Sequence, residues 1–337
     1  MEIEIDNTNV DNNLPWVEKY RPKKIDEVSH QDEVTATLRT SIEKGSLPHL
    51  LFYGPPGTGK TSTILALCHE LYGPEMKNRV MELNASDERG INVIREKVKT
   101  FAQIIAKKTV PGYPCPPFKI IIMDEADSMT PDAQGALRRI MELYSNVTRF
   151  CLICNYVSRI IPPLASRCIK FGYKPLPLVS IRDRLLYICD QEGVKTNEDC
   201  LDYIISLSHG DMRHAIHTLQ NASVLFDKDI NKEQVETISM SFPQQDLNSF
   251  WSSIQSNNFQ LLQQRVEENL LKGYPISIIL TSLYNLIITK TDLSDHSKAS
   301  MCLVLAESEK NIMDGSDSEI QLLNIGSQLM TILHNSK

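Results

Sequence analysis

The sequence predicts an α/β domain built on a parallel sheet, followed by two domains made of helices. Over roughly the first 170 residues, short apolar stretches alternate with helical segments, a pattern typical of parallel strands covered by helices on both faces. A Gly- and Pro-rich octapeptide, residues 54–61, joins one apolar stretch to the helix that follows it. After residues 174–177, Lys-Pro-Leu-Pro, only helical periodicity remains.

Four apolar stretches are short enough to be strands buried in such a sheet. They are residues 50–53, 79–83, 119–123 and 150–154, with helices between them near 60–72, 91–106 and 131–144. Thr130 and Pro131 start the last of these helices well, with a hydroxyl cap and a proline in the first turn. Further helices are expected near 178–192, 197–208, 211–226 and 231–240 and, beyond Phe242 and Pro243, near 246–255, 257–271, 275–290, 295–312 and 317–334.

These patterns divide the chain into four parts. We expect a disordered tail over residues 1–14, an α/β domain over 15–174, and helical domains over 175–240 and 241–337. The tail is acidic and rich in Asn, which is unlike a secretion signal. No apolar run reaches the roughly 18 residues that cross a bilayer, so no membrane partner is expected.

Charge and cysteine content narrow the class of protein. A net charge of −7 argues against a surface that binds nucleic acid everywhere, although it leaves room for a local basic strip. The eight cysteines are scattered among apolar residues, which fits reduced thiols in the cytosol or the nucleus. Cys151 and Cys154 form a Cys-x-x-Cys pair inside an apolar strand. Because no second pair accompanies them, we expect buried thiols rather than a zinc site.

The octapeptide is the most informative feature of the chain. A strand, a Gly-rich turn and a helix that begins with Lys-Thr form the setting in which a P-loop binds a nucleoside triphosphate. The glycines let backbone amides point at phosphate oxygens, and the N-terminal end of the helix adds positive partial charge. A plain Gly-rich hairpin would not need Lys-Thr at this point. ATP or GTP is therefore expected at Gly54, Pro55, Pro56, Gly57, Thr58, Gly59, Lys60, Thr61 and Ser62, with Lys60 on the β- and γ-phosphates and Thr61 on Mg²⁺.

An acidic pair follows the third apolar stretch. We expect this strand to lie next to the strand that precedes the P-loop. That arrangement places Asp124 near the magnesium and lets Glu125 orient and deprotonate the attacking water. The alternative is an acidic loop after a buried strand. The catalytic interpretation is favoured because the pair comes about 60 residues after a complete P-loop.

Three further residues are candidates for contact with the γ-phosphate. Asn155 ends the fourth apolar stretch and, beside the other motifs, is favoured as a γ-phosphate sensor over a turn former. Arg167, in Ser-Arg-Cys, is either a surface charge or an arginine finger that neutralises the transferring phosphoryl group of a neighbouring subunit. Arg213 opens a helix of the second domain, from which it could touch the same nucleotide. Spacing alone does not decide the roles of the two arginines.

Residues 89–108 form a basic strip. They carry six Lys and Arg side chains against Glu96 alone, a balance of +5. Arg95 and Lys99 are four residues apart and therefore share one face of the expected helix. Taken by itself, this face is best interpreted as solvated.

Together these motifs resemble the AAA+ ATPases and, more narrowly, the small subunits of the replication factor C clamp loaders. The resemblance is dense over residues 15–225, whereas beyond about 240 only a helical pattern is shared. Residues 114–119 and 127–130 resemble one type of small subunit in particular. The segments that carry the match are 16–22, the P-loop, 82–90, 124–127, 166–168 and 210–213.

The resemblance implies a role for each nucleotide-site residue. ATP and Mg²⁺ are the implied cofactors, with Val17 and Arg21 lining the nucleotide pocket. Asn155 and Arg213 are the two implied sensors, and Arg167 is the finger given in trans. Residues 175–240 would then be a lid, and residues 241–337 an oligomerisation collar within a heteropentamer.

Roles for the basic strip also follow from the resemblance. Arg95 and Lys99 would face primer–template DNA in a central channel and meet its backbone phosphates without reading sequence. Asn84 would link Glu125 to that surface. The sliding clamp, PCNA, would bind an apolar surface formed by Phe101, Ile104, Ile105 and the loop 111–117. Packing in the core of the domain would explain the apolar character of these residues equally well.

The function implied is ATP-driven loading of the sliding clamp onto primer–template DNA, for replication and repair in the nucleus. One alternative is a branch-migration motor of the same superfamily that forms a closed hexamer. The roughly 95 residues of helix at the end of the chain favour a static collar over such a motor. A second alternative is a scaffold subunit whose nucleotide is structural only.

Overall fold

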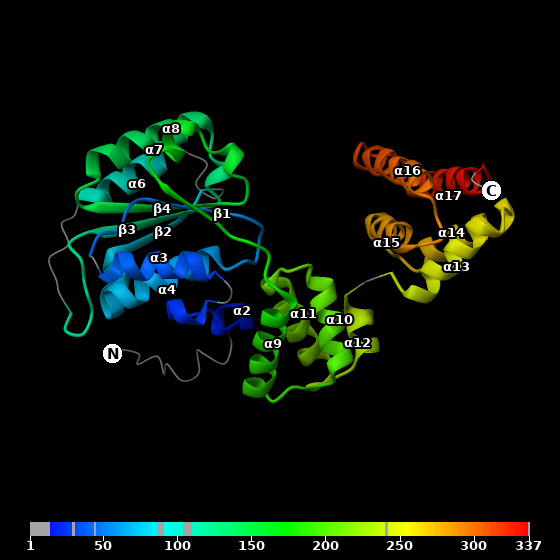
Figure 1. Cartoon of the computed structure of the whole chain (residues 1–337), viewed down its shortest axis with the longest axis horizontal. Helices are drawn as coiled ribbons and strands as arrows, with labels where there is room; N and C mark the ends of the chain where they lie inside the picture. Colours follow the sequence, from blue (N-terminus) through cyan, green and yellow to red (C-terminus); the bar gives the residue numbers. More distant parts are fainter. Residues whose placement is uncertain are drawn as a thin grey trace, which may run out of the picture. The chain divides into compact units, whose positions relative to one another are not determined.

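The computed structural model describes residues 14–28, 31–43, 45–85, 91–103, 110–239 and 242–335, of which 43, 91–95 and 335 are described by their backbone alone. Within the chain two compact units are found, Met1–Lys232 and Glu233–Lys337 (Figure 1). Apart from Leu14, the tail expected over 1–14 lies outside the described residues.

A five-stranded sheet in which every neighbouring pair is parallel forms the centre of the first unit. Its strands are β1 (Leu50–Tyr53), β2 (Val80–Asn84), β3 (Lys119–Asp124), β4 (Thr148–Cys154) and β5 (Ile169–Gly172). The α/β class with a parallel sheet is therefore confirmed. The order is β2-β3-β4-β1-β5, so β4 lies between the P-loop strand and the strand that ends at Asp124. The expected adjacency of those two strands is wrong.

Helices cover both faces of this sheet (Figure 1). On one face lie α3 (Asp32–Glu43) and α4 (Lys60–Tyr72), and on the other α6 (Ile91–Gln103), α7 (Pro131–Tyr144) and α8 (Pro162–Ala165). Two apolar clusters seal the faces, since side chains alternate across each strand. Phe52 belongs to the first cluster and Leu51 to the second. Two short α-helices, α2 (Trp16–Lys19) and α5 (Met76–Arg79), also lie in this part of the chain, and its described residues include four 3₁₀ helices: η2 (Ile25–Glu27), η3 (Gly73–Glu75), η4 (Ala126–Ser128) and η5 (Val157–Arg159).

Four lid helices follow the α/β domain: α9 (Leu178–Glu192), α10 (Glu198–Ser208), α11 (Met212–Leu225) and α12 (Lys232–Ile238). Side-chain caps start two of them, because Asn197 accepts a hydrogen bond from Cys200 N and Asp211 accepts one from Arg213 N. One feature departs from the helices-only expectation. Two strands of two residues each, β6 (Lys195–Thr196) and β7 (Asp229–Ile230), pair in parallel.

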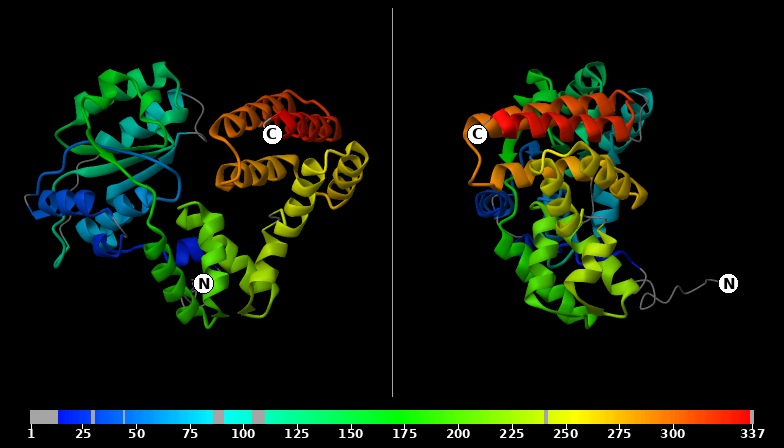
Figure 2. Two further views of the ribbon diagram at one scale, coloured as in Figure 1. Left: turned by 45° about the vertical axis from the view of Figure 1, so that its right-hand side comes forward. Right: turned by 90° about the vertical axis from the view of Figure 1, so that its right-hand side faces the viewer.

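Five collar helices make up most of the second unit: α13 (Gln244–Gln255), α14 (Phe259–Leu271), α15 (Ile276–Thr289), α16 (Asp295–Met313) and α17 (Ser318–Asn335). The helices α16 and α17 run side by side in both views of Figure 2. Gly326 lets α17 approach α14, because a Cβ there would lie 2.5 Å from Leu262 Cδ2. Among the described residues, no helix combines the length and apolarity that a membrane span requires.

Candidate nucleotide-binding site

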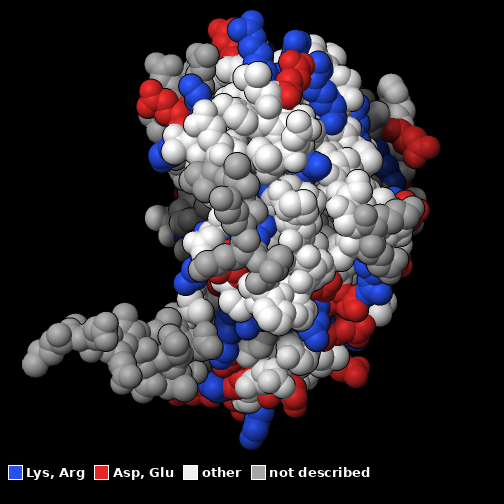
Figure 3. Space-filling model, turned by 90° about the vertical axis from the view of Figure 1, so that its left-hand side faces the viewer, with Lys and Arg blue, Asp and Glu red and all other residues white. Residues whose placement is uncertain are grey.

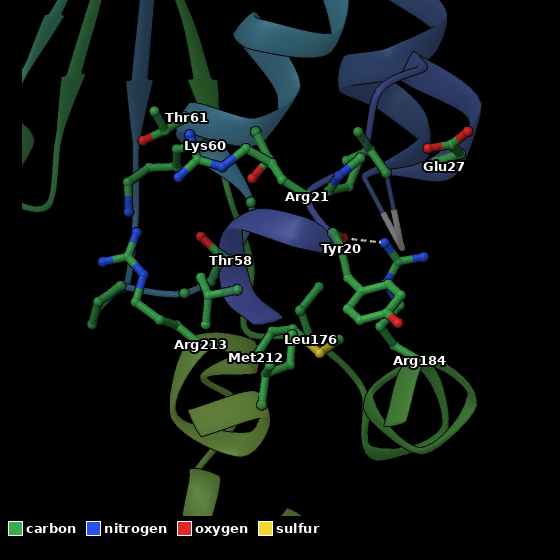
Figure 4. Close-up of a pocket in the computed structure, with 18 of the residues that line it drawn as sticks. Tyr20, Arg21, Glu27, Thr58, Lys60, Thr61, Leu176, Arg184, Met212 and Arg213 are labelled. Carbon is green, nitrogen blue, oxygen red and sulfur yellow. Dashed lines mark hydrogen bonds between the residues drawn. The ribbon is translucent and has the colours of Figure 1, made fainter. Parts of the chain in front are cut away.

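A pocket opens where the P-loop, the ends of β3 and β4, the N-terminal segment and the lid helices meet (Figure 4). Most of the predicted nucleotide-binding residues line it: Val17, Arg21, Pro56, Gly57, Thr58, Gly59, Lys60, Thr61, Ser62, Asn155 and Arg213. Gly54 and Pro55 are not among the lining residues, but their carbonyls accept hydrogen bonds from Lys60. All of these residues belong to the first unit.

The P-loop has the backbone geometry of an anion site. Gly57 (φ 66°) and Gly59 (φ 94°) adopt the left-handed region, which glycine enters without steric cost. Helix α4 begins at Lys60 without a side-chain cap, so its first amides and its positive dipole end remain available to a phosphate. The loop is therefore built to hold phosphate oxygens by main-chain donors.

Lys60 is buried at the centre of the loop, with 7% of its surface exposed. Its Nζ donates to Gly54 O (2.8 Å), to Pro55 O (2.7 Å) and to Asn155 Oδ1 (3.1 Å). Burial lowers the pKa of Lys60, and the carboxylate of Asp124 opposes that shift. The ammonium group is thus held between the P-loop and the end of β4, which lies beside β1.

The acidic pair at the end of β3 reaches the same pocket. Thr61 Oγ1 on α4 donates to Asp124 Oδ2 at 2.8 Å, although β4 lies between β3 and the strand β1 that precedes the P-loop. Both residues line the pocket and carry oxygens of the kind that Mg²⁺ prefers, so they fit a magnesium ion. Glu125 is exposed at the pocket rim in a left-handed conformation (φ 52°), and its amide donates to Asp124 Oδ1 at 2.8 Å.

Asp127 holds the turn that carries Asn155. Its Oδ2 accepts hydrogen bonds from Asn155 N and from Tyr156 N, each at 3.1 Å. Sequence reasoning gave Asp127 no role, since only the turn after β4 brings these amides to it. The carboxylate fixes the backbone of Asn155 and leaves its side-chain amide for Lys60 and for the pocket.

The lid approaches the P-loop closely. Asp211 Oδ1 accepts from Arg213 N (2.8 Å) and His214 N (3.3 Å), and a Cβ at Gly57 would lie only 1.7 Å from that oxygen. Arg213 extends from α11 toward the loop (Figure 4). The sequence analysis gave no role to the apolar and aromatic part of the wall: Tyr20, Val28, Leu176, Met212 and Ile216. Tyr20 and Met212 lie in the matching segments 16–22 and 210–213, whereas the other three lie in none of them.

Comparison with known proteins identifies the family. The sequence profile of the ATPase family associated with various cellular activities (AAA) matches residues 50–176, and that of the RCF1/5-like AAA+ ATPase lid domain matches 183–224. The profile of the replication factor C C-terminal domain matches residues 242–328. Replication factor C subunit 4 of Homo sapiens is 49% identical over 320 residues, which cover 94% of this chain and 88% of that protein. The chain belongs to the replication factor C family.

Other relatives agree. Replication factor C subunit 2 of Saccharomyces cerevisiae is 48% identical over 321 residues, covering 92% of this chain and 91% of its own. Subunit 2 of Oryza sativa subsp. japonica is 48% identical and covers 96% of both chains. The expected subunit type, numbered fourth in human and second in yeast, is among them. The chain is a clamp-loader ATPase of the AAA+ class.

Solved structures show the same fold in more distant proteins. The RuvB Holliday junction branch migration motor of Thermotoga maritima is 17% identical with a TM-score of 0.51, covering 69% of this chain and 79% of the motor. At this identity the likeness concerns the fold alone.

Arg167 lies apart from the pocket of its own chain. Its Nη1 donates to Pro163 O at 2.6 Å, and its guanidinium pairs with Glu142, which Arg138 also contacts at 3.4 Å. It is not among the residues that line the pocket. An arginine so placed acts on its own nucleotide only if the chain rearranges.

The predicted DNA and clamp residues of this replication factor C chain are only partly described. Lys99 is exposed on α6, whereas the side chain of Arg95 and residues Ile104 and Ile105 lie outside the described part. Phe101 is half-buried against the second apolar cluster, with Lys119 Nζ 4.2 Å from its ring centre. Asn84 ends β2 in register with Asp124. On the face drawn in Figure 3, basic and acidic side chains are interspersed.

Proposed function

We propose that this chain is an ATP-binding and ATP-hydrolysing subunit of a heteropentameric clamp loader. The complex opens the sliding clamp, PCNA, and closes it around primer–template DNA for replication and repair in the nucleus. One observation carries the proposal: the hydrogen-bonded set of Lys60, Asn155, Thr61 and Asp124 around the P-loop, in a chain of the replication factor C family. We assign residues 15–174 to the ATPase domain, 175–240 to the lid and 241–337 to the collar.

Each residue of the set has a distinct task in hydrolysis. The P-loop amides and Lys60 bind the β- and γ-phosphates, and Val17 and Arg21 wall the rest of the nucleotide. Thr61 and Asp124 hold Mg²⁺, which when bound neutralises charge on the phosphate oxygens. Glu125 takes the proton of the attacking water. Asn155 and Arg213 contact the γ-phosphate, so loss of the γ-phosphate removes one contact at the end of β4 and one in the lid.

Arg167 completes the site of a neighbouring subunit. It stands outside its own pocket, fixed by Pro163 and Glu142, as an arginine that serves another protomer would be. Charge stabilisation by such a finger makes hydrolysis depend on how two subunits meet. Nucleotide state then shifts assembly geometry because the two states bind the neighbour unequally.

The outer surfaces serve the macromolecular partners. Arg95 and Lys99 bind backbone phosphates of primer–template DNA, giving affinity without sequence readout. The apolar end of α6 and the loop 111–117 contact the clamp. Phe101 is half-buried in the core, so the exposed Tyr113 and its Pro-rich neighbours form the larger part of that contact.

Clamp loading by the reconstituted complex tests the function. With wild-type chain, a circular clamp should be loaded onto primed circular DNA only when ATP is present. Lys60→Ala should abolish loading, whereas Lys170→Ala, which changes an exposed cation on β5, should not. Loading that is unaffected by Lys60→Ala would instead favour the scaffold alternative. Directional strand displacement by the purified chain would favour the motor.

A further inference from the structure

The N-terminal segment Trp16–Val28, here called the strap, links the lid to the P-loop helix. At one end Trp16 N donates to Gln220 Oε1 on α11 at 3.0 Å. At the other end Ile25 N donates to Glu70 Oε1 on α4 at 2.8 Å, and Ile25 is fully buried in the first apolar cluster. The strap therefore joins the two parts of this unit independently of the covalent connection through residues 173–177.

Glu192 is the main anchor of the strap on the lid. Its Oε1 accepts hydrogen bonds from Lys19 Nζ (2.7 Å) and from Tyr20 OH (2.6 Å), and only 14% of its side chain is exposed. Burial acts to raise the pKa of Glu192, but the hydrogen bonds from Lys19 and Tyr20 lower it overall. A second contact supports the first, since Arg184 on α9 donates to the Tyr20 carbonyl (Figure 4).

The position of Glu192 argues for a specific role. It is the last residue of α9, and a carboxylate at a helix C-terminus is disfavoured by the helix dipole. Its partners on the strap are 172 and 173 residues away in sequence, so it does not serve the local structure of the helix. Lys228 donates to the Glu192 carbonyl and also lowers the pKa of the carboxyl, so part of the compensation comes from the lid itself. Lys19 and Tyr20 add direct hydrogen bonds to the carboxylate, and they do so only while the strap lies on the lid.

The strap and the lid together form one wall of the nucleotide pocket. Val17, Tyr20 and Arg21 line it from the strap, and Arg184, Met212 and Ile216 line it from the lid. Between the two anchored ends, residues 22–24 make a local contact in which Lys23 N donates to Glu27 Oε2 at 2.9 Å.

We propose that Glu192 is a positioning residue for nucleotide binding: by holding Lys19 and Tyr20 it fixes the strap on the lid, so that the strap wall of the pocket moves with the lid. The proposal rests on the proposed function, because it takes this pocket to be the ATP site. It predicts that loosening the anchor weakens nucleotide affinity and leaves the chemical step intact. The P-loop, Asp124 and Glu125 make none of their hydrogen bonds to Glu192.

The test compares ATP affinity and turnover in the full-length chain within its complex. Glu192→Ala should raise the dissociation constant of a fluorescent ATP analogue and the KM for ATP about tenfold, with kcat within about twofold. Tyr20→Phe should raise the dissociation constant and the KM less than Glu192→Ala does. The effect of Glu192→Gln should lie between those of Tyr20→Phe and Glu192→Ala, because its amide oxygen still accepts hydrogen bonds but lacks charge. Asp190→Ala, an exposed acid on the same helix, is the matched control and should change nothing.

Two further variants separate the possible outcomes. Adding Tyr20→Phe to Glu192→Ala should cause no further loss, since both act through one hydrogen-bonded group. Additive losses, or equal affinities for Glu192→Ala and Asp190→Ala, overturn the proposal. Lys60→Ala must abolish binding. If it does not, the pocket is not the nucleotide site and the proposed function fails as well. Should Glu192→Ala fail to fold, the ranking of Tyr20→Phe and Glu192→Gln against the control decides.

Discussion

The hydroxyl of Thr61 donates a hydrogen bond to the carboxylate of Asp124 at 2.8 Å, although β4 lies between β1, which precedes the P-loop, and β3, which ends at Asp124. Thr61 follows the P-loop into α4, which covers one face of the sheet. Asp124 is the last residue of β3 and is in register with the end of β2. The magnesium ligands and the phosphate-binding loop are thus assembled from separate segments. Each part of the site can therefore be changed separately.

Replacing the proposed general base should separate binding from hydrolysis. Glu125→Gln keeps the size of the side chain but cannot accept the proton, so kcat should fall by about 10²-fold or more while ATP affinity stays unchanged. Phosphate release and equilibrium nucleotide binding measure the two quantities. Asp132→Asn, which alters an exposed acid in the first turn of α7, is the control. Full hydrolysis by Glu125→Gln would remove the catalytic assignment.

If Arg167 acts in trans, its replacement should affect hydrolysis in the neighbouring subunit rather than in its own. Arg167→Ala should leave ATP binding by its own subunit intact and lower hydrolysis at the neighbouring site by roughly 10³-fold. Arg138→Ala changes the other arginine that contacts Glu142 and should be nearly silent. Single-turnover hydrolysis in complexes with one active site would resolve the sites. Loss of nucleotide affinity in the altered subunit itself would contradict the assignment.

DNA contact by α6 predicts a change in salt dependence. Arg95→Ala and Lys99→Ala should weaken DNA-stimulated ATPase activity, and each should reduce the slope of log affinity against log salt by about 1. Lys77→Ala, an exposed cation on α5, should leave the slope unchanged. A salt titration with primed DNA gives the answer. An unaltered slope in both α6 variants would place the DNA elsewhere.

Replacement by alanine should be harmful at Gly57 and stabilising at Gly135. At Gly57 the added Cβ would collide with Asp211 Oδ1, 1.7 Å away, and φ is 66°, so Gly57→Ala should sharply reduce ATP affinity. Gly135 lies in the middle of α7 with nothing within 4 Å of an added Cβ. Gly135→Ala should therefore raise the free energy of unfolding by about 0.5–1 kcal/mol. Chemical denaturation and nucleotide titration of both variants check this contrast.

His49 should make the fold sensitive to mild acid. Burial, with Arg149 nearby, lowers its pKa to about 4, and its Nδ1 accepts from Phe150 N at 3.1 Å. A folded-state pKa below the unfolded value near 6.5 means that stability is full above pH 6.5 and is lost as the pH falls toward 4. Partial exposure limits the loss to about 1–2 kcal/mol between pH 7 and pH 5. His49→Asn keeps an acceptor that does not titrate, so between pH 7 and pH 5 the free energy of unfolding should fall by that much less in this variant than in the wild type. Chemical denaturation at a series of pH values measures the fall. An identical fall in both proteins would assign the acid sensitivity to other groups.

Local signals predicted some elements to the residue and left others out. α7 was predicted at its observed ends because Thr130 caps it, accepting from Ala133 N at 3.3 Å, and Pro131 starts it. The strand β5 was not expected, since its residues are half-exposed or exposed at the edge of the sheet and show no apolar run. Motifs identified the reactive groups of the pocket, because phosphate and magnesium demand particular side chains. Strand order and the strap–lid contacts could not be inferred, because pairs such as Tyr20 and Glu192 are brought together only by the packing of distant segments.

The long sequence separation between the strap and the lid also affects folding during translation. Trp16 emerges early, but its acceptor Gln220 is synthesised 204 residues later. At translation rates of roughly 5–20 residues per second, that interval lasts about 10–40 s. Throughout it the N-terminal end of the strap has no lid to dock on. The nascent chain therefore completes the strap wall of the proposed ATP pocket only after the lid has been synthesised.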